Sequence, residues 1–346
     1  MENNSFDNAP YSGGSNYPPY VTYVPYGFTP KTYSEKKGIR KTALVIGIAF
    51  IVELLITTFW ATGYFFVMGR LGFTVAKARE IITDPAALQV AQIVLSSFIF
   101  TVPFIIVFKS FGFNISETVP LKKSQKGNRL TLFLLGISFC SFANIATSQA
   151  SSIFESFGIN YNVDYGEDPK GFFGFCLSML STVIVPALVE EFACRGLILG
   201  SLRKYGDGFA VLTSAIVFGL MHGNFEQMPF AFIIGLVLGF IVVKTDSLLI
   251  AMAVHAFNNF VSVFFSYFAG SISAAAQNAV YSVFLLVCLL AGIISLLHSK
   301  NQAELFKFGE DGNESKLNQR FKWFFTSPCI IIFTVFCILE SLQFFM

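Results

Sequence analysis

The feature that most constrains this chain is its series of long apolar runs. About 20 consecutive apolar residues in a helix cross the hydrocarbon core of a bilayer. The 346-residue sequence has roughly eight or nine such runs, at about 42–68, 86–108, 130–150, 172–199, 209–222, 228–243, 248–269, 275–297 and 329–346. They predict an all-α fold, a polytopic membrane bundle of about eight or nine transmembrane helices. The fifth and sixth runs are short and flank HGNFEQMP, where we expect a break or a re-entrant turn.

Composition and charge agree with a membrane protein. The chain is 54% hydrophobic and 13% charged, whereas soluble domains are about 45–50% apolar and about 25% charged. The net charge of +2 implies no nucleic-acid partner. Cationic residues gather before the first run and after the second, and the loop near residue 160 is acidic. By the positive-inside rule the N-terminus is cytosolic, in a multi-pass protein of the cell membrane.

The same pattern divides the chain into regions. Residues 1–40 are rich in Tyr, Pro, Asn, Gly and Ser and predict a disordered cytosolic tail. Residues 41–300 form the predicted transmembrane bundle, 301–328 a polar cytosolic linker, and 329–346 a final hydrophobic helix.

Few ionisable residues lie at membrane depth. They are Glu53, Glu190, Glu191, Arg195, His222, Glu226, His255 and Glu340. A charge at mid-bilayer costs about 2.5–3.5 kcal/mol on insertion scales, so such residues usually face the bundle interior and have a function. Glu53 and Glu340 have no patterned neighbours and are interpreted as packed polar residues. Glu226 lies at a segment boundary and is interpreted as interfacial.

The two adjacent glutamates differ in their expected partners. Glu191 and Arg195 are four residues apart, so they share a helix face and neutralise each other as an ion pair. Glu190 diverges from that face by about 100°. It is therefore left as the carboxylate available to act as a general base.

Two of the three histidines belong to the same neighbourhood. Glu190 and His222 lie about equally far from the turn at 204–207, which puts them at one depth in an antiparallel helix pair. His255 has Asn259 one turn later on the same face. The same arithmetic places His255 several ångströms nearer the cytosol, a difference that helix tilt or a break near Gly223 would close. Helix-to-helix hydrogen bonding is the alternative interpretation of these histidines.

These residues resemble the CAAX-protease and bacteriocin-processing family of intramembrane endopeptidases, also called the Abi family or type II prenyl endopeptidases. The pattern E-E-x-x-x-R matches Glu190, Glu191 and Arg195. F-x-x-x-H matches Phe218 and His222, and H-x-x-x-N/D matches His255 and Asn259. The resemblance covers about 172–268, the expected catalytic core, and leaves out the N-terminal tail and the last segment.

The resemblance implies a conical cavity open to cytosol and bilayer. It implies hydrolysis of a peptide bond near the C-terminus of a membrane-associated or prenylated protein or peptide. Glu190 and His222 would activate water, His255 and Asn259 would stabilise the oxyanion, and Glu191 and Arg195 would position the first pair. Glu190, His222 and His255 also form a known set of Zn²⁺ ligands. A metal-free mechanism based on glutamate is the alternative.

Two other classes of function compete with a protease. A proton-coupled transporter also uses intramembrane acids and histidines, but inverted repeats and paired broken helices are not apparent in the sequence. A non-enzymatic membrane partner, such as a bacteriocin self-immunity protein or a scaffold, would keep the fold without needing a complete set of motifs. Nothing outside the motifs identifies the substrate.

Overall fold

Each predicted apolar run corresponds to helix in the computed structural model, which describes residues 31–121, 128–157, 169–269, 271–299, 302–309 and 312–343. The described residues contain helices and no strand, which confirms the predicted all-α fold. The elements are α1 (Lys31–Arg70), α2 (Val75–Thr83), α3 (Pro85–Ile99), α4 (Val102–Ser110), α5 (Ile115–Thr118), α6 (Arg129–Ser156), α7 (Gly171–Ser178), η1 (Met179–Ile184), α8 (Val185–Glu191), η2 (Phe192–Leu199), α9 (Gly200–Leu202), η3 (Arg203–Tyr205), α10 (Asp207–Leu220), α11 (Gln227–Thr245), α12 (Leu248–Tyr267), α13 (Ala274–Leu297), α14 (Gln302–Phe306), α15 (Leu317–Phe325) and α16 (Pro328–Leu342).

The number of membrane-spanning helices agrees with a polytopic bundle. Within the described part of the chain, seven spans are long and apolar enough to cross a bilayer, with α3 and α4 joined as one of them. An eighth arises if α15 and α16, bent by 75° at their junction, count as one broken span. Helix α10 is apolar but shorter, with 14 residues. A bend is expected between α15 and α16 because Pro328 at the start of α16 cannot continue the hydrogen-bond ladder.

Two predicted boundaries need correction. The tail predicted for residues 1–40 ends earlier, because α1 begins at Lys31; residues 1–30 lie outside the described residues. Glu35 accepts hydrogen bonds from the backbone N–H groups of Glu314 and Ser315, both at 3.0 Å, and so ties the first turns of α1 to the C-terminal region. The predicted linker 301–328 contains α14 and α15, and α15 buries Arg320 and Phe324.

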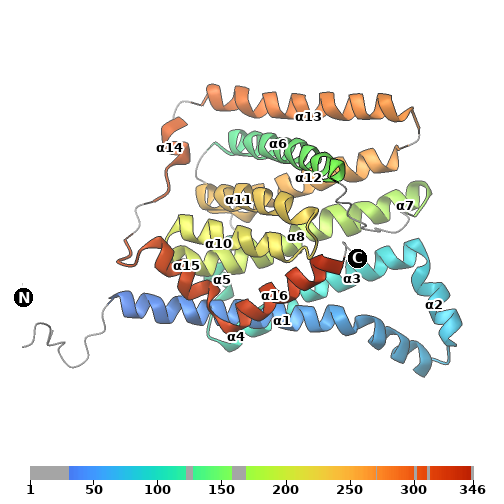
Figure 1. Ribbon diagram of the computed structural model, residues 1–346, viewed down its shortest axis with the longest axis horizontal. Coiled ribbons are helices and arrows are strands. Elements are labelled where there is room, and N and C mark those ends of the chain that lie inside the picture. Colours follow the sequence, from blue (N-terminus) through green and yellow to red (C-terminus); the bar gives the residue numbers. More distant parts are fainter. Residues whose placement is uncertain are drawn as a thin grey trace, which may run out of the picture.

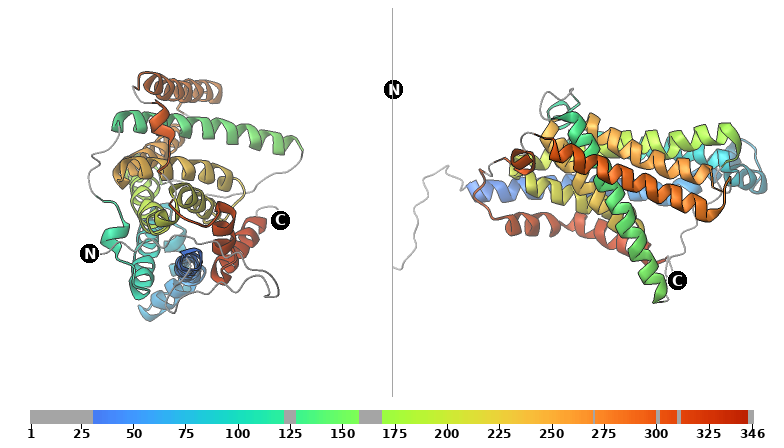
Figure 2. Two further views of the ribbon diagram at one scale, coloured as in Figure 1. Left: turned by 90° about the vertical axis from the view of Figure 1, so that its left-hand side faces the viewer. Right: turned by 90° about the horizontal axis from the view of Figure 1, so that it is seen from above.

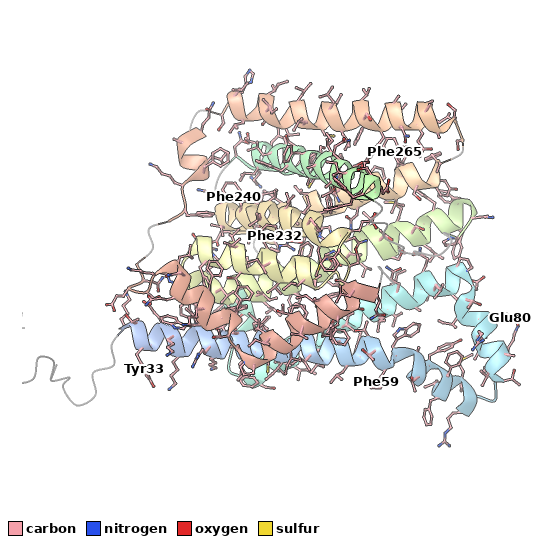
Figure 3. All side chains as sticks on the ribbon, in the orientation of Figure 1. Tyr33, Phe59, Glu80, Phe232, Phe240 and Phe265 are labelled. Carbon is pink, nitrogen blue, oxygen red and sulfur yellow. The ribbon has the colours of Figure 1, made fainter. Side chains whose placement is uncertain are left out.

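The helices pack in successive layers across the bundle (Figure 1). Helices α6 and α13 pack against each other at one side, and α1 packs against α4 and α16 at the other, with α8, α10, α11 and α12 between them. Seen from above, α13 crosses α6 at an angle (Figure 2). Figure 3 shows side chains along the outer side of α13. Val283 and Ile294 of this helix are large, apolar and exposed, as expected of a face toward lipid.

The helix that carries the two glutamates is irregular. From Gly171 to Tyr205 it forms one candidate span, yet two π-helical segments, η1 and η2, flank α8. Wide π turns are rare and occur often at functional sites. Pro186 has no N–H, so the carbonyl of Thr182, four residues earlier, receives no α-helical hydrogen bond from it. That carbonyl accepts a hydrogen bond from another helix, α12.

Candidate active site

A cavity of about 370 Å³ lies inside the bundle beside α8. Helices α8, α10, α11 and α12 form most of its wall, with further residues from α3, α6, η1 and the turn after α10. Its lining comprises Gln92, Asn144, Thr182, Pro186, Glu190, Phe218, His222, Gln227, Phe230, Ala231, Ile234, His255, Asn258, Asn259 and Ser262. Four of the six predicted site residues line this cavity, namely Glu190, His222, His255 and Asn259.

The other two predicted residues, Glu191 and Arg195, lie behind the cavity as a buried ion pair. Arg195 Nη1 donates to Glu191 Oε1 at 2.8 Å, and both side chains are fully buried. The guanidinium also lies over the ring of Phe218, with Cζ 4.0 Å from the ring centroid. Arg195 Nε and Nη2 and Glu191 Oε2 have no hydrogen-bond partner within the described residues. The charges thus neutralise each other away from the cavity, as the four-residue spacing predicted.

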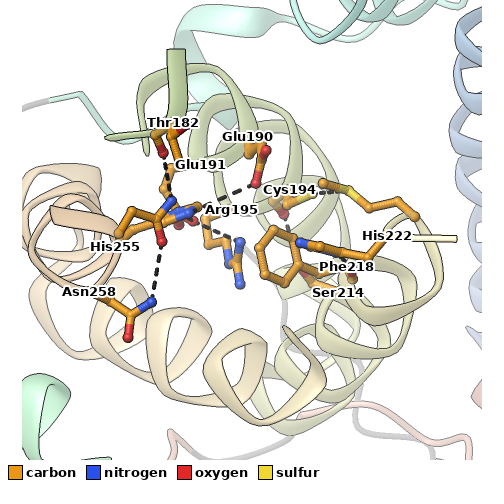
Figure 4. A network of polar contacts seen from close by, with 12 residues as sticks. Thr182, Glu190, Glu191, Cys194, Arg195, Ser214, Phe218, His222, His255 and Asn258 are labelled. Atoms are coloured by element: carbon orange, nitrogen blue, oxygen red, sulfur yellow. Dashed lines mark hydrogen bonds and ion pairs between the residues drawn. The ribbon is translucent and has the colours of Figure 1, made fainter. Parts of the chain in front are cut away.

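His255 joins this pair to Glu190 (Figure 4). Its Nδ1 lies 2.9 Å from Glu191 Oε1, the same oxygen that accepts from Arg195. Its Nε2 faces Glu190 Oε2 at 3.9 Å, beyond hydrogen-bond distance. Because a carboxylate oxygen accepts, Nδ1 carries the proton, and Nε2 is the nitrogen that faces the cavity. Glu190 forms no ion pair with Arg195, which matches its predicted divergence from the Glu191 face.

His222 reaches the cavity from a turn. It lies two residues past Leu220, the last residue of α10, and its Nδ1 lies 2.8 Å from the backbone carbonyl of Phe218. Gly223 then takes the left-handed conformation, with φ +62°. Asn224 holds the turn, because its Nδ2 donates to the His222 carbonyl at 3.1 Å and its Oδ1 accepts from Gln227 N–H at 2.7 Å. The break expected within HGNFEQMP therefore lies directly after His222.

The two histidines line one cavity despite the difference in depth that the residue count predicted. The Phe218 ring contacts both edge-on, with centroid distances of 4.9 Å to His222 and 6.1 Å to His255. His222, His255 and Glu190 thus converge on one space from three different helices or their ends (Figure 4).

Asn259 bonds to the Thr182 carbonyl, which has no α-helical donor because residue 186 is a proline. Its Nδ2 donates to the carbonyl of Thr182 at 2.9 Å, and this bond links α12 to η1. Pro186 was a signal for this contact in the sequence, because a proline leaves the carbonyl four residues earlier without its α-helical donor. Two further asparagines, Asn144 and Asn258, lie in the same wall and were not among the predicted site residues.

The remaining intramembrane acids lie elsewhere. Glu53 and Glu340 are not part of the cavity lining. Glu53 is half-buried, whereas Glu340 is exposed, so the interpretation as a packed residue is wrong for Glu340. Glu53 accepts a bond from Thr57 Oγ1 at 3.3 Å within its own helix. Glu340 approaches the far side of the turn at Gly223.

The donors around the cavity are of the kinds that catalytic zinc uses, namely two imidazole nitrogens and a carboxylate. Each histidine also has its Nδ1 occupied, by a carbonyl for His222 and a carboxylate for His255, as is common for zinc ligands. Among the described residues, however, no three His, Cys, Asp or Glu side chains lie close enough together to hold a metal ion. The side chains of Glu190, His222 and His255 therefore do not fit a metal ion in this arrangement.

Comparisons with known proteins agree with the site. Residues 172–261 match the family described as type II CAAX prenyl endopeptidase Rce1-like. This segment contains all six predicted site residues, and it agrees with the core expected at about 172–268. Searches of curated proteins and of solved structures gave no significant match. Residues 172–261 of this multi-pass membrane chain are thus similar to the Rce1-like family of CAAX-type intramembrane proteases.

Proposed function

We propose that this chain hydrolyses a peptide bond of a membrane-associated or prenylated protein or peptide with a water activated by Glu190 and His222. One observation carries the proposal. Of two adjacent glutamates, Glu191 is fully buried and bonded to Arg195 and His255, whereas Glu190 is half-buried and lines the cavity, with His255 Nε2 3.9 Å from its Oε2, beyond hydrogen-bond distance. A carboxylate held in that way is suited to accept a proton from water.

The reaction follows from the positions of the proton donors and acceptors. The His222 Nδ1–H is donated to the Phe218 carbonyl, so Nε2 of the neutral ring offers a lone pair to water. Glu190 accepts the proton of that water, and the hydroxide adds to the carbonyl carbon of the substrate. The C–N bond then breaks, and the proton held by Glu190 passes to the leaving amine. A peptide bond and one water are thus converted into a carboxylate and an amine.

His255 and Asn259 are proposed to stabilise the oxyanion. Asn259 Nδ2 gives one proton to Thr182 and has a second N–H for the cavity. His255 donates from Nε2 when its ring carries both protons, and Glu191 beside Nδ1 is the carboxylate that supports this charge. Donors placed where negative charge develops commonly contribute about 10²–10³-fold to the rate each.

The test is a comparison of wild type with Glu190→Gln, which keeps the shape and removes the base. Removal of a general base lowers the rate by about 10²–10⁴-fold. Uncleaved membrane proteins or peptides accumulate in the Glu190→Gln strain and are identified by proteomics of C-termini. Glu53→Gln, at another intramembrane glutamate outside the cavity, is the matched control and leaves the C-termini unchanged. Full activity of purified Glu190→Gln would overturn the proposal and favour the non-enzymatic membrane partner.

The role of zinc is open to a separate test. A zinc bound by Glu190, His222 and His255 needs Nε2 of His255 as a lone-pair donor, whereas the oxyanion role needs Nε2 protonated. The two versions therefore require opposite states of one nitrogen. In the zinc version 1,10-phenanthroline inhibits cleavage, added Zn²⁺ restores it, and elemental analysis finds the metal. An active preparation without metal supports the glutamate version.

We also propose the orientation that the loop charges predict, with the N-terminus in the cytosol. Single cysteines placed in the basic first turns of α1 and at the acidic end of α6 are expected to react with a membrane-impermeant maleimide from opposite sides. Equal labelling from one side would overturn this orientation.

A further inference from the structure

Three asparagine side chains form a chain of hydrogen bonds along the polar wall of the cavity. Asn144 Nδ2, on α6, donates to Asn258 Oδ1 at 3.1 Å. Asn258 Nδ2 donates to Asn259 Oδ1 at 3.2 Å. Asn259 Nδ2 donates to the Thr182 carbonyl at 2.9 Å (Figure 4). Every amide gives an N–H to the oxygen of the next, so the chain has one direction, from α6 to η1.

Both ends of this chain fix that direction. At the start, Asn144 Nδ2 also donates to the carbonyl of Cys140 at 2.9 Å, and a carbonyl can only accept. At the end, the Thr182 carbonyl can likewise only accept, and Pro186 cannot supply its α-helical partner. If any one of the three amides flipped, an oxygen would face an oxygen or an N–H an N–H. The two ends therefore hold the three amides in the same orientation.

The direction matters for the chemistry of Asn259. In the observed orientation its Oδ1 is occupied by Asn258, and its Nδ2 has a second N–H beside the cavity. In the flipped orientation the amide oxygen would take the place of Nδ2. A lone pair would then face the negative charge that develops on the substrate, and stabilisation would become repulsion. Asn144 is bonded to Asn258 rather than to Asn259, so it influences Asn259 only through Asn258.

We propose that Asn144 and Asn258 are positioning residues that fix the amide of Asn259 as a hydrogen-bond donor toward the oxyanion. The inference rests on the proposed hydrolase function. It extends the functional unit to α6, which lies outside the segment matched by the family. It also assigns a role to the Thr182 carbonyl, which is the last acceptor in the chain of asparagine hydrogen bonds.

The main experiment is a double-mutant cycle on the purified full chain. The probe is an internally quenched peptide that ends in a farnesylated CAAX sequence. Asn259→Ala is expected to lower kcat by about 10²–10³-fold, as loss of an oxyanion donor does. Asn144→Leu, of similar volume, is expected to lower kcat by about 10-fold with KM little changed, since a positioning loss is partial. In the Asn259→Ala background, Asn144→Leu has no further effect, because its target is absent.

A matched control lies one turn along the same helix. Thr147→Val removes a hydroxyl that bonds only within α6, at 2.8 Å to the Ala143 carbonyl and 3.3 Å to the Asn144 carbonyl. Its kcat stays at the wild-type value. If Asn144→Leu lowers kcat by the same factor with and without Asn259, the residue acts independently and the positioning role is wrong. If Glu190→Gln cleaves the peptide as well as wild type does, the proposed function is wrong instead.

A second measurement does not depend on activity. In protein labelled with ¹⁵N-asparagine, the side-chain amide signal of Asn259 is assigned by its loss in Asn259→Ala. That signal shifts in Asn144→Leu and stays in place in Thr147→Val. An Asn259 signal that does not respond to Asn144→Leu would overturn the chain of asparagines, whatever the peptide assay gives.

Discussion

The two histidines of the cavity are held in contrasting ways. His255 lies within a helix, and its Nδ1 is bonded to a carboxylate that belongs to a fully buried ion pair. His222 lies just beyond the end of a helix, and its Nδ1 is bonded to a backbone carbonyl four residues earlier. Both arrangements leave Nε2 as the nitrogen for the cavity. The Nε2 atom of His255 is thus oriented by a network of charged groups, and the Nε2 atom of His222 by a backbone carbonyl.

This contrast predicts which substitutions should change the position of each imidazole ring. A change of buried charge alters the support of His255 and leaves the Phe218 carbonyl in place for His222. A change of backbone conformation near Gly223 alters the support of His222 and leaves the Glu191–Arg195 pair intact. Substitutions on the two sides should therefore separate in stability and in activity.

The largest effect is expected from Glu191→Ala. The change leaves Arg195 as an unpaired charge with a fully buried side chain, and breaking a buried pair from one side typically costs 3–5 kcal/mol, here about 4 kcal/mol. The free energy of unfolding in mixed micelles is the measurement. In Glu191→Ala/Arg195→Met most of that loss is recovered, because no charge is left unpaired. Cleavage stays low in the double variant, because His255 Nδ1 still lacks its partner.

The pair would be shown to be unimportant for stability if the single variant unfolded like wild type. Full recovery of cleavage in the double variant would show that His255 does not depend on Glu191. Either result would remove the contrast between the two histidines.

A smaller effect is expected on the other side, from Gly223→Ala. Its φ of +62° costs an L-residue about 1–2 kcal/mol. A Cβ there would also lie 2.8 Å from Oε2 of Glu340, so that side chain must move. We expect a loss of about 1–2 kcal/mol in unfolding free energy, with reduced cleavage because His222 precedes this residue.

Two further variants separate the causes. Gly223→Ala/Glu340→Ala removes the contact and leaves the backbone strain, so it recovers only part of the activity. Gly63→Ala on α1, where a Cβ would meet no atom within 4 Å, is the control and keeps wild-type activity. Unchanged cleavage in Gly223→Ala would show that the position of His222 does not depend on the turn.

The helices were predictable because their signal is local. Most of the apolar runs have the length of a bilayer span, and a run of that kind satisfies its backbone only by forming a helix. Helix α15 also had a local signal, because Leu317, Phe321, Phe324 and Phe325 follow the period of an amphipathic helix. The burial of Arg320 had none, because its Nη1 donates to the Tyr205 carbonyl at 2.7 Å, across 115 residues of sequence.

The site divides in the same way. The spacing of Glu191 and Arg195 was enough to predict their ion pair, because residues four apart share a helix face. Depth counted at 1.5 Å per residue did not bring His222 and His255 together, although both line one cavity, because a count of residues contains no helix tilt. Asn144 was missed because its role depends on a contact 114 residues away, with Asn258.

The smallest effect is expected from Phe218→Leu, which acts where the two supports meet. The ring lies over Arg195 and beside both imidazoles, while the backbone carbonyl that holds His222 survives the change. A desolvated cation–π contact contributes about 0.5–2 kcal/mol, so we expect a loss of about 1 kcal/mol in unfolding free energy. Phe230→Leu removes a ring from the same cavity and is the matched control. Because the contact is with Arg195, the excess loss over the control should vanish in the Arg195→Met background; an excess that persists there would assign the ring to His222 instead.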